Sequence, residues 1–341
     1  MTECASMRLQ EQIEMMLSSQ KRLWPLVGEN YAALSRLKKT YFTGYDSRSS
    51  YVEVQYNPQR LASSSARVDE ASLRARKCFL CVENQPREQA TIVWREKYKI
   101  QVNPYPIFSR HFTIAALEHA PQRIMGRVGD LLRLAEELPD YVVFYNGPRC
   151  GASVPDHFHF QAGVKSELPI CEQIEDMPKN VAIVTQREGG MCKEEQVSGF
   201  LLQSYGRMMY HFACEDARDA VAWHESLQDR LPRIGGDEAG QNVLCWTTAS
   251  KWHYHMLVFP RTKHRPSFYG TEEGHYLLSP ASVDMGGLVV LAREEDFDRI
   301  TVDDVMMMYC EVTRDEANCA ASWKIIEEER AKALSYLNKT K

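Results

Sequence analysis

Apolar residues recur at helical intervals near the start of the chain and alternate with polar residues at many later positions. Within residues 5–38, Ile13, Met16 and Leu17 are spaced at helical intervals, which predicts helices broken near Pro25. Further helical patterns cover residues 122–138, 302–313 and 315–337. Alternating or apolar runs predict strands at residues 51–56, 91–94, 98–103, 112–117, 141–145, 157–161, 181–185, 242–247, 252–259 and 285–291. We interpret residues 196–211 as helical or mixed, and residues 215–236 as a charged excursion or linker.

The segment 141–163 places a turn between two strands. The apolar run at 141–145 is followed by turn-forming residues at 146–151 and then by strict alternation at 157–161. Side chains two apart in a strand share a face, so His157, His159 and Gln161 are expected on one side with two Phe residues packed behind. Two imidazoles and a carboxamide beneath a glycine-containing loop make this stretch the candidate active site.

The same arrangement recurs about 100 residues later in the chain. An apolar strand at 242–247, a short connection and an alternating strand with His253 and His255 repeat the order strand, connection, His-x-His strand. This pattern predicts an internal structural duplication. We therefore expect domains at residues 1–190 and 191–341, the second with a degenerate His-x-His strand.

Composition narrows the class of protein. The 341 residues carry a formal net charge of -5, which argues against a general nucleic-acid-binding surface. Neither a signal pattern nor a run of ~18 apolar residues occurs, so we expect no membrane span and a cytoplasmic protein. Ten cysteines are too sparse for a disulfide framework. Most are expected to be buried apolar residues, among them Cys214, Cys245, Cys310 and Cys319.

Three interpretations of the His-x-His-x-Gln strand compete. The spacing from Gly151 to His159 fits the first part of a cupin metal motif, but Glu167 lies too far along to complete it. Buried structural histidines would explain one imidazole more easily than two. We favour the third interpretation, in which an imidazole attacks phosphorus and the Gln161 amide and loop N–H groups stabilise the phosphate oxygens.

Two signals elsewhere are weak when taken alone. Cys78 and Cys81 are three apart, a spacing that presents two thiolates to zinc, but no second pair follows within ~20 residues. Spacing therefore leaves two buried thiols and a metal site both open. Arg60 follows a predicted strand, and contact with a phosphate is one option for it.

The motifs resemble one family. Gly151-Ala-Ser153-Val-Pro155 followed by His157-Phe-His159-Phe-Gln161 is similar to the motif of the galactose-1-phosphate uridylyltransferase branch of the histidine-triad (HIT) superfamily. That branch also contains diadenosine tetraphosphate phosphorylases and nucleoside-diphosphate-sugar phosphorylases. The resemblance implies an α+β fold with two HIT-like domains in tandem, each an antiparallel sheet flanked by helices.

The resemblance also assigns roles. It implies that His159 is the nucleophile and that Gln161 and Ser153 hold phosphates. It further implies nucleotide or phosphate contacts by the residues Asn57, Arg60, Asn146, Gly147 and Gly151. One departure concerns Asp156, an extra residue between Ser153 and Gln161 relative to the family pattern, so that the loop either bulges or makes the serine contact differently.

Two metal sites follow from the same resemblance. The first is a zinc site formed by Cys78, Cys81, His119 and His157. A second metal would use Glu175, His253 and His255, although its fourth ligand has no evident match in the sequence.

The implied reaction is nucleotidyl transfer by a ping-pong route. A nucleoside-diphosphate sugar or dinucleoside polyphosphate donates the nucleotidyl group, and inorganic phosphate or a sugar 1-phosphate accepts it. A homodimer is allowed, and neither nucleic acid nor a membrane is an expected partner. A metal-dependent nucleotide hydrolase and a non-catalytic nucleotide-binding protein are the alternatives.

Overall fold

The computed structural model describes residues 7–43, 51–174, 181–187, 190–198, 207–236 and 238–313. Its first half contains the elements α1 (Leu9–Leu23), α2 (Pro25–Ala33), β1 (Lys38–Thr43), β2 (Tyr51–Tyr56), α3 (Leu61–Ser64), α4 (Glu70–Ala75), β3 (Ile92–Trp94), β4 (Tyr98–Val102), β5 (His111–Ala116), α5 (Val128–Glu137), β6 (Tyr141–Asn146), β7 (His159–Val164) and α6 (Ile170–Gln173). Short 3-10 turns at Leu34–Arg36, Pro58–Arg60, Val82–Asn84 and Lys165–Glu167 join some of them.

The second half continues with β8 (Val181–Arg187), β9 (Gly190–Ser198), β10 (Met208–Cys214), α7 (Ala217–Leu227), a 3-10 turn at Gln228–Arg230, β11 (Gln241–Thr247), β12 (Tyr254–Pro260), α8 (Ser282–Met285), β13 (Leu288–Leu291), α9 (Glu294–Arg299) and α10 (Val302–Thr313). None of the described helices is long and apolar enough to cross a bilayer.

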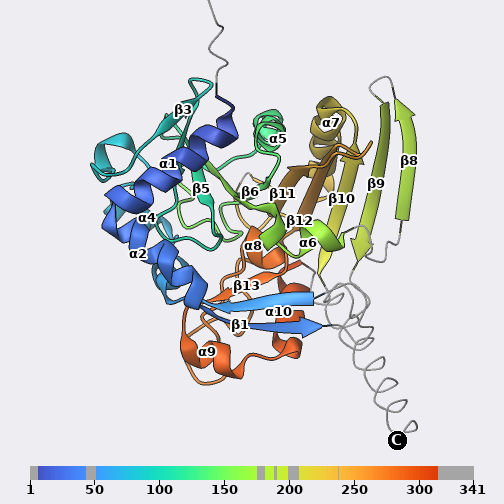
Figure 1. Cartoon of the computed structure of the whole chain (residues 1–341). Coiled ribbons are helices and arrows are strands. Elements are labelled where there is room, and N and C mark those ends of the chain that lie inside the picture. The colour runs from blue at the N-terminus through green and yellow to red at the C-terminus, as the bar shows by residue number, and fades with distance from the viewer. Residues whose placement is uncertain are drawn as a thin grey trace, which may run out of the picture.

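One ten-stranded sheet organises the molecule, and every neighbouring pair in it is antiparallel (Figure 1). Its order is β3-β4-β5-β7-β6-β11-β12-β10-β9-β8. Each half contributes five strands to this sheet, β3 to β7 in the first half and β8 to β12 in the second. Counted along the chain and taken from either edge inwards, they lie in the order first, second, third, fifth, fourth. A helix lies between the third and fourth strands of both halves, α5 in the first and α7 in the second. The strand order thus repeats, and β6 and β11 join the two halves at the centre.

The α+β class with antiparallel strands and flanking helices is confirmed, and the strands of the two halves form one continuous sheet. The expected boundary at residues 190 and 191 falls at the beginning of β9, which pairs with β8 in a hairpin. Division into two HIT-like domains stays a prediction.

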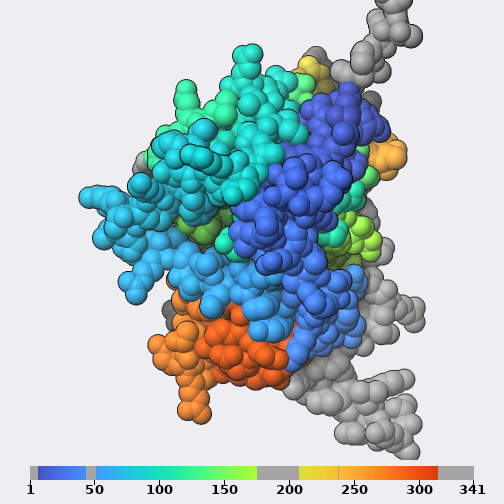
Figure 2. All heavy atoms as spheres, turned by 60° about the vertical axis from the view of Figure 1, so that its left-hand side comes forward, coloured from blue at the N-terminus to red at the C-terminus, as the bar shows by residue number. Residues whose placement is uncertain are grey.

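A smaller sheet ties the N-terminal region to the C-terminal region. It has the order β1-β2-β13, and β13 runs parallel to β2. Lys38 at the start of β1 reaches Glu294 in α9 at 2.5 Å. Figure 2 shows the blue N-terminal helices across one side of the molecule, with the orange-red C-terminal segments below the light-blue strands.

Each face of the large sheet has its own core. Phe158, Phe160 and Tyr145 pack on one face with apolar residues of α1, α2, α5 and α7. On the opposite face, Phe144 and Trp246 pack with residues of α8, β13 and α10. Alternation along β7 therefore directs the two Phe side chains into the first core and leaves His159 and Gln161 on the other face.

Two interpretations of the second half were wrong. Residues 196–198 belong to β9 and residues 208–211 to β10, so the parts of 196–211 that the structure describes are strands. Residues 217–227 form helix α7, whose first turn is capped by Asp216 accepting from the Arg218 N–H at 2.8 Å. Its many charges had suggested a linker, but Ala220, Trp223 and Leu227 are buried on one face. The predicted helix at 315–337 and Cys319 lie outside the described residues.

Candidate active site and metal centre

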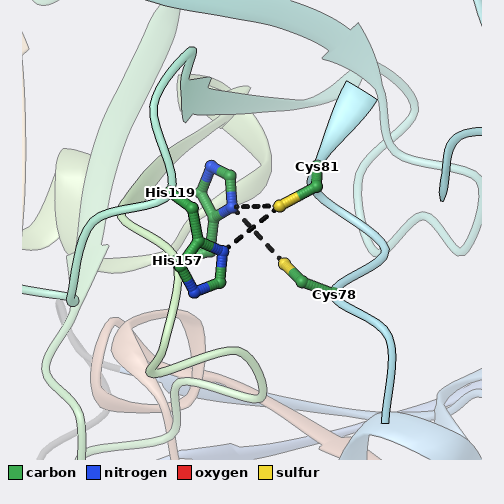
Figure 3. Close-up of side chains that lie close together, drawn as sticks. All are labelled: Cys78, Cys81, His119 and His157. Carbon is green, nitrogen blue, oxygen red and sulfur yellow. Dashed lines mark hydrogen bonds between the residues drawn. The ribbon is translucent and has the colours of Figure 1, made fainter. Parts of the chain in front are cut away.

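Four side chains from three separate loops converge beside the large sheet (Figure 3). Cys78 and Cys81 come from the turn after α4, His119 follows β5, and His157 immediately precedes β7. Their ligand atoms all lie within 4.8 Å of one another. The structure thus brings together the four residues assigned to the first metal site, and among the described residues no other such group of His, Cys, Asp and Glu forms.

The spacing of these atoms fits a tetrahedral ion. Cys81 Sγ lies 3.2 Å from His119 Nδ1 and 3.5 Å from His157 Nδ1, and Cys78 Sγ lies 3.4 Å from His157 Nδ1. Zinc at ~2.3 Å from sulfur and ~2.1 Å from nitrogen would hold those atoms about 3.6 Å apart. His157 Nε2 lies 2.9 Å from the Ala116 carbonyl, so with Nε2 protonated the ring presents Nδ1 to the ion.

The cysteine turn is built independently of any ion. The Cys81 N–H donates to the Cys78 carbonyl at 3.2 Å, and Asn84 Nδ2 donates to the same carbonyl at 2.9 Å. The buried Lys99 ammonium donates to the Leu80 carbonyl between the two cysteines. Burial, and next the neighbouring Cys78, raise the pKa of the Cys81 thiol to about 11, so metal binding would have to displace a proton from this thiol.

Asp156 joins this turn to the loop that precedes β7. Its carboxylate accepts from Arg76 at 2.5 Å, and each side chain is about one quarter exposed. Arg76 lies two residues before Cys78, and Asp156 lies next to His157. The extra residue therefore forms an ion pair between two segments that carry metal-site side chains.

His159 lies at the start of β7, buried, with its two ring nitrogens in different surroundings. Nδ1 lies 2.9 Å from the His157 carbonyl and must carry the proton of that hydrogen bond. Nε2 then has a free lone pair. Burial, as the main cause, lowers the pKa of His159 to about 4, so the imidazole is neutral at pH 7.

Gln161 lies two residues further along the same face and is paired with a histidine of β5. His111 Nε2 lies 3.0 Å from Gln161 Oε1, while His111 Nδ1 accepts from the Ile107 N–H at 3.2 Å. Burial, and next the charge of Arg60, lower the pKa of His111 to about 3. Because a neutral His111 donates to the Gln161 oxygen, the Gln161 NH₂ group is the end that can donate to a ligand.

The loop that follows β6 is held by residues of the second half. Asn146 Oδ1 accepts from Asn242 Nδ2 at 2.9 Å and from the Ser282 N–H and hydroxyl, each at 2.7 Å. Arg261, fully buried, donates to Asn242 Oδ1 at 2.6 Å. This network fixes the side chain of Asn146 and leaves its amide NH₂ as the group able to reach a phosphate.

Two glycines let this loop approach other backbone segments closely. A Cβ on Gly147 would meet the Gln241 carbonyl at 2.8 Å. Gly151 has φ +89°, and a Cβ there would meet Ala281 at 2.5 Å. The glycines therefore determine the shape of the loop, and their predicted phosphate contacts would come through backbone N–H groups.

The remaining predicted contacts lie at different distances from this centre. Arg60 donates to the Tyr105 carbonyl at 2.9 Å and lies near His111, close to Gln161. Asn57 is fully buried, and its amide bonds the Pro106 carbonyl and the Gln59 N–H, so its ligand contact stays a prediction. Ser153 is half-buried in the loop and makes no hydrogen bond to another residue in the described part of the chain.

The second predicted metal site is incompletely described. Glu175 lies outside the described residues. His255 Nδ1 lies 3.1 Å from His211 Nε2, and its ring stacks on Trp246 at 5.3 Å, whereas His253 Nδ1 bonds the Thr248 carbonyl at 2.8 Å. This site stays a prediction.

A cavity of about 190 Å³ lies beside the β6–β7 loop, which comprises residues 147–158. It is lined by residues 121–123, 148–150, 155 and the segments 234–236 and 238–240. Neither His159 nor Gln161 lines it, so we do not assign this cavity to the reaction.

Sequence reasoning missed several residues that shape the site, namely His111, Gln122, Asn242, Arg261 and Ser282. His111 directly precedes the predicted strand at 112–117, a position that alone does not indicate a role in the site. Gln122, Asn242 and Ser282 contact the segment 141–163 from positions distant in sequence, and Arg261 acts through Asn242. No local motif predicts any of the four.

The chain is similar to a family profile and to several known proteins. A family profile described as "Domain of unknown function (DUF4922)" matches residues 16–164, which include the cysteine pair and the His-x-His-x-Gln strand. A galactose-1-phosphate uridylyltransferase of Halalkalibacterium halodurans is 31% identical over 103 residues, a match that covers 26% of this chain and 20% of that relative. The chain thus matches about a fifth of the length of this curated relative.

Among solved structures, the yeast Ap4A phosphorylase Apa2 in complex with Ap4A aligns with a TM-score of 0.50 and 17% identity, over 85% of this chain and 97% of that chain. A galactose-1-phosphate uridylyltransferase-like protein from Arabidopsis thaliana aligns with a TM-score of 0.33 and 16% identity, over 81% of this chain and all of that one. At such identities, the likeness to the yeast enzyme shows a shared fold. Together with the uridylyltransferase match, it confirms the resemblance to this branch of the HIT superfamily.

Proposed function

We propose that the protein is a nucleotidyltransferase or phosphorylase that works through a covalent nucleotidyl-His159 intermediate. One observation carries the proposal: the bond from His159 Nδ1 to the His157 carbonyl leaves Nε2 as a buried, unprotonated nucleophile. The resemblance to a branch that contains nucleotidyl-transferring enzymes agrees with it. The yeast neighbour was solved with Ap4A bound, which supports a nucleotide as the substrate of this chain also.

The first half-reaction forms one bond and breaks one bond. Nε2 of His159 attacks the α-phosphorus of a nucleoside-diphosphate sugar or dinucleoside polyphosphate, and a P–N bond forms. The bond from phosphorus to the bridging oxygen breaks, and the phosphorylated product leaves with that electron pair. The ring becomes cationic, and its Nδ1–H remains bonded to the His157 carbonyl. The Gln161 and Asn146 amides and loop N–H groups donate to the phosphate oxygens.

The second half-reaction discharges the intermediate. An oxygen of inorganic phosphate or of a sugar 1-phosphate attacks the same phosphorus, the P–N bond breaks, and its electron pair returns to Nε2. Water as the acceptor would make the protein a hydrolase instead. Phosphate, sugar 1-phosphate and water thus distinguish the phosphorylase, the transferase and the alternative hydrolase.

We further propose that the first metal site holds zinc. Cys78, Cys81, His119 and His157 would bind it, and two thiols with two imidazoles are a donor set that zinc accepts. Bound zinc would cross-link the three loops and fix the position of His157, whose carbonyl holds the His159 ring.

Covalent labelling tests the proposal. Protein incubated with α-phosphate-labelled nucleoside-diphosphate sugars or dinucleoside polyphosphates should retain label in an acid-labile, base-stable bond. His159→Ala should abolish the label, whereas His275→Ala, a change at a histidine of a surface loop, should keep it. Labelled wild-type protein is then treated with phosphate, sugar 1-phosphate or buffer alone to identify the acceptor. No label from any donor would rule out the covalent route and leave nucleotide binding as the alternative.

A further inference from the structure

Gln122 is a fully buried polar residue in the segment between β5 and α5. Its side-chain oxygen accepts from the His159 N–H at 2.8 Å. Its side-chain nitrogen donates to the His159 carbonyl and to the Asn146 carbonyl, each at 2.9 Å. One amide therefore binds the backbone of the proposed nucleophile and the backbone of the loop that would meet the phosphate.

The position of this amide follows from the strand register. The last paired residues of β6 and β7 are Phe144 and Gln161. Continuing by two residues on each strand would pair Asn146 with His159, and their backbone groups would bond each other directly. The Gln122 amide occupies that place and bonds these groups instead. The two strands part at this point, and the glutamine fills the gap between them.

The backbone of Gln122 is fixed from two other sides. Its N–H donates to the Pro155 carbonyl at 3.1 Å, in the loop that leads to β7. Its carbonyl accepts from the Tyr145 hydroxyl at 3.0 Å. Gln122 thus contacts β6, the loop and β7 at once, and its bonds to Asn146, His159 and Tyr145 are buried. A residue held this rigidly can define a spacing between the segments that it touches.

We propose that Gln122 is a positioning residue that sets the spacing between His159 and Asn146 and so keeps a gap for the transferred phosphate group. The inference rests on the proposed nucleotidyl transfer. An uninterrupted, hydrogen-bonded strand pair would bring Asn146 and His159 to ~5.5 Å between their Cα atoms, with both side chains on one face. A bridging amide holds them further apart while it pairs both backbone groups of His159 and the Asn146 carbonyl.

Hydrogen exchange of the His159 amide tests the bonds between Gln122 and the backbone of His159 without using the reaction. The His159 N–H has the Gln122 oxygen as its acceptor, so its exchange with deuterium should be slow. Gln122→Met keeps the length of the side chain but can neither accept nor donate here, and it should speed exchange at this amide by about tenfold or more. Gln122→Asn keeps the amide but is one methylene shorter, and it should act in the same direction.

Gln20→Met provides a matched control. Gln20 is also buried and also bridges two backbone groups, donating to the Glu88 carbonyl at 2.9 Å and accepting from the Ala90 N–H at 3.1 Å. Its partners Glu88 and Ala90 both lie outside β6 and β7. Its replacement should cost stability in a comparable way and leave exchange at His159 unchanged.

Single-turnover labelling then separates positioning from a merely structural role. At equal folded fraction, Gln122→Met should form the labelled adduct about 10- to 100-fold more slowly than Gln20→Met, because displacement of the nucleophile lowers the rate of attack. Donor affinity, measured with His159→Ala in the background, should change by less than about threefold. Zinc content should be the same in both variants.

Three results would overturn the inference. Unchanged exchange at His159 in Gln122→Met would show that Gln122 does not hold the His159 backbone. Equal adduct rates in Gln122→Met and Gln20→Met would show that Gln122 has no positioning role in the reaction. A loss of donor affinity equal to the loss of rate would make Gln122 a binding residue. If the wild-type protein forms no adduct, the proposed function fails, and the catalytic part of this inference fails with it.

Discussion

The β6–β7 loop contains a residue whose backbone and surroundings both require glycine. Gly151 has φ +89°, and a Cβ there would lie 2.5 Å from the Ala281 Cβ and 2.9 Å from the Pro280 carbonyl. Both the dihedral angle and the contact disfavour any other residue. The loop beside His159 therefore depends on the absence of one methyl group.

Replacing this glycine should disturb the loop more than the rest of the fold. We expect Gly151→Ala to destabilise the protein by about 1–3 kcal/mol and to slow adduct formation. Urea unfolding and single-turnover labelling measure the two effects. Ala281→Gly in the same chain should restore part of the loss, because it removes the nearest of the contacting atoms. Strictly additive effects of the two changes would argue against this contact.

The buried His224 makes the stability of the folded protein depend on pH. It is fully buried in α7, and its Nε2 lies 2.9 Å from Gln241 Oε1. Burial lowers its pKa from 6.5 to about 4. Between these two pH values the unfolded chain binds a proton that the folded chain does not, so folding stability falls as the pH falls from 6.5 to 4.

His224→Gln should remove this contribution. Between pH 7 and pH 4.5 the free energy of unfolding should drop by about 2–3 kcal/mol less in the variant than in the wild-type protein. Urea unfolding at the two pH values gives the comparison. An identical drop in both proteins would show that His224 does not hold the lowered pKa.

At the scale of elements, the Arg76–Asp156 pair connects the cysteine turn to the start of β7. Partly exposed ion pairs contribute up to about 1 kcal/mol. Arg76→Met and Asp156→Asn should therefore each weaken zinc retention up to about fivefold, and the double variant should lose no more than either single one. Competition with a chromophoric chelator measures the affinity.

Arg74→Met is the matched control for this pair. Arg74 lies in the last turn of α4, two residues before Arg76, and pairs with Glu70 at 2.7 Å, but both side chains are at least 80% exposed. Its loss should leave zinc retention unchanged. A weakening equal to that of Arg76→Met would point to the helix as a whole instead of the pair.

Some of these elements and site residues could be predicted from the sequence, and others could not. Period-two patterns located β2 and β12, and a continuous apolar run located β6, because the apolar residues of these strands face packed cores. The prediction for residues 217–227 was wrong because the many charged residues suggested a linker, whereas one face of this helix is apolar and buried. Four metal-site residues were reached only through a family resemblance, since spacing left Cys78 and Cys81 undecided. Gln122, Asn242 and Arg261 could not be found in this way, because their partners are set by how the strands meet in space.

At the scale of the whole molecule, the sheet joins the halves through β6 and β11. Four residues of each strand are paired, from Val143–Cys245 to Asn146–Asn242. Apolar residues of both halves share each core cluster. The free energy of each half therefore depends on the presence of the other.

We expect the chain to unfold as one cooperative unit. Labelling the tryptophans with a fluorine probe lets NMR follow Trp94 in the first half and Trp246 in the second during one urea titration. Both signals should disappear with the same midpoint. Midpoints separated by about 1 M or more would instead support two domains that fold separately, with a boundary near residue 190.

The end of β6 and the loop after it contact a segment that is synthesised much later. Gly151 lies against Ala281, and Asn146 binds Ser282. A ribosome delivers the first half of a chain well before the second, and folding begins during delivery. His159 is thus synthesised about 120 residues, and the turn of Cys78 and Cys81 about 200 residues, before the segment 281–282 that contacts the loop. Under the proposed mechanism, a nascent or truncated chain would contain His159 but lack the contacts of residues 281–282 that shape the loop, and it would therefore not react.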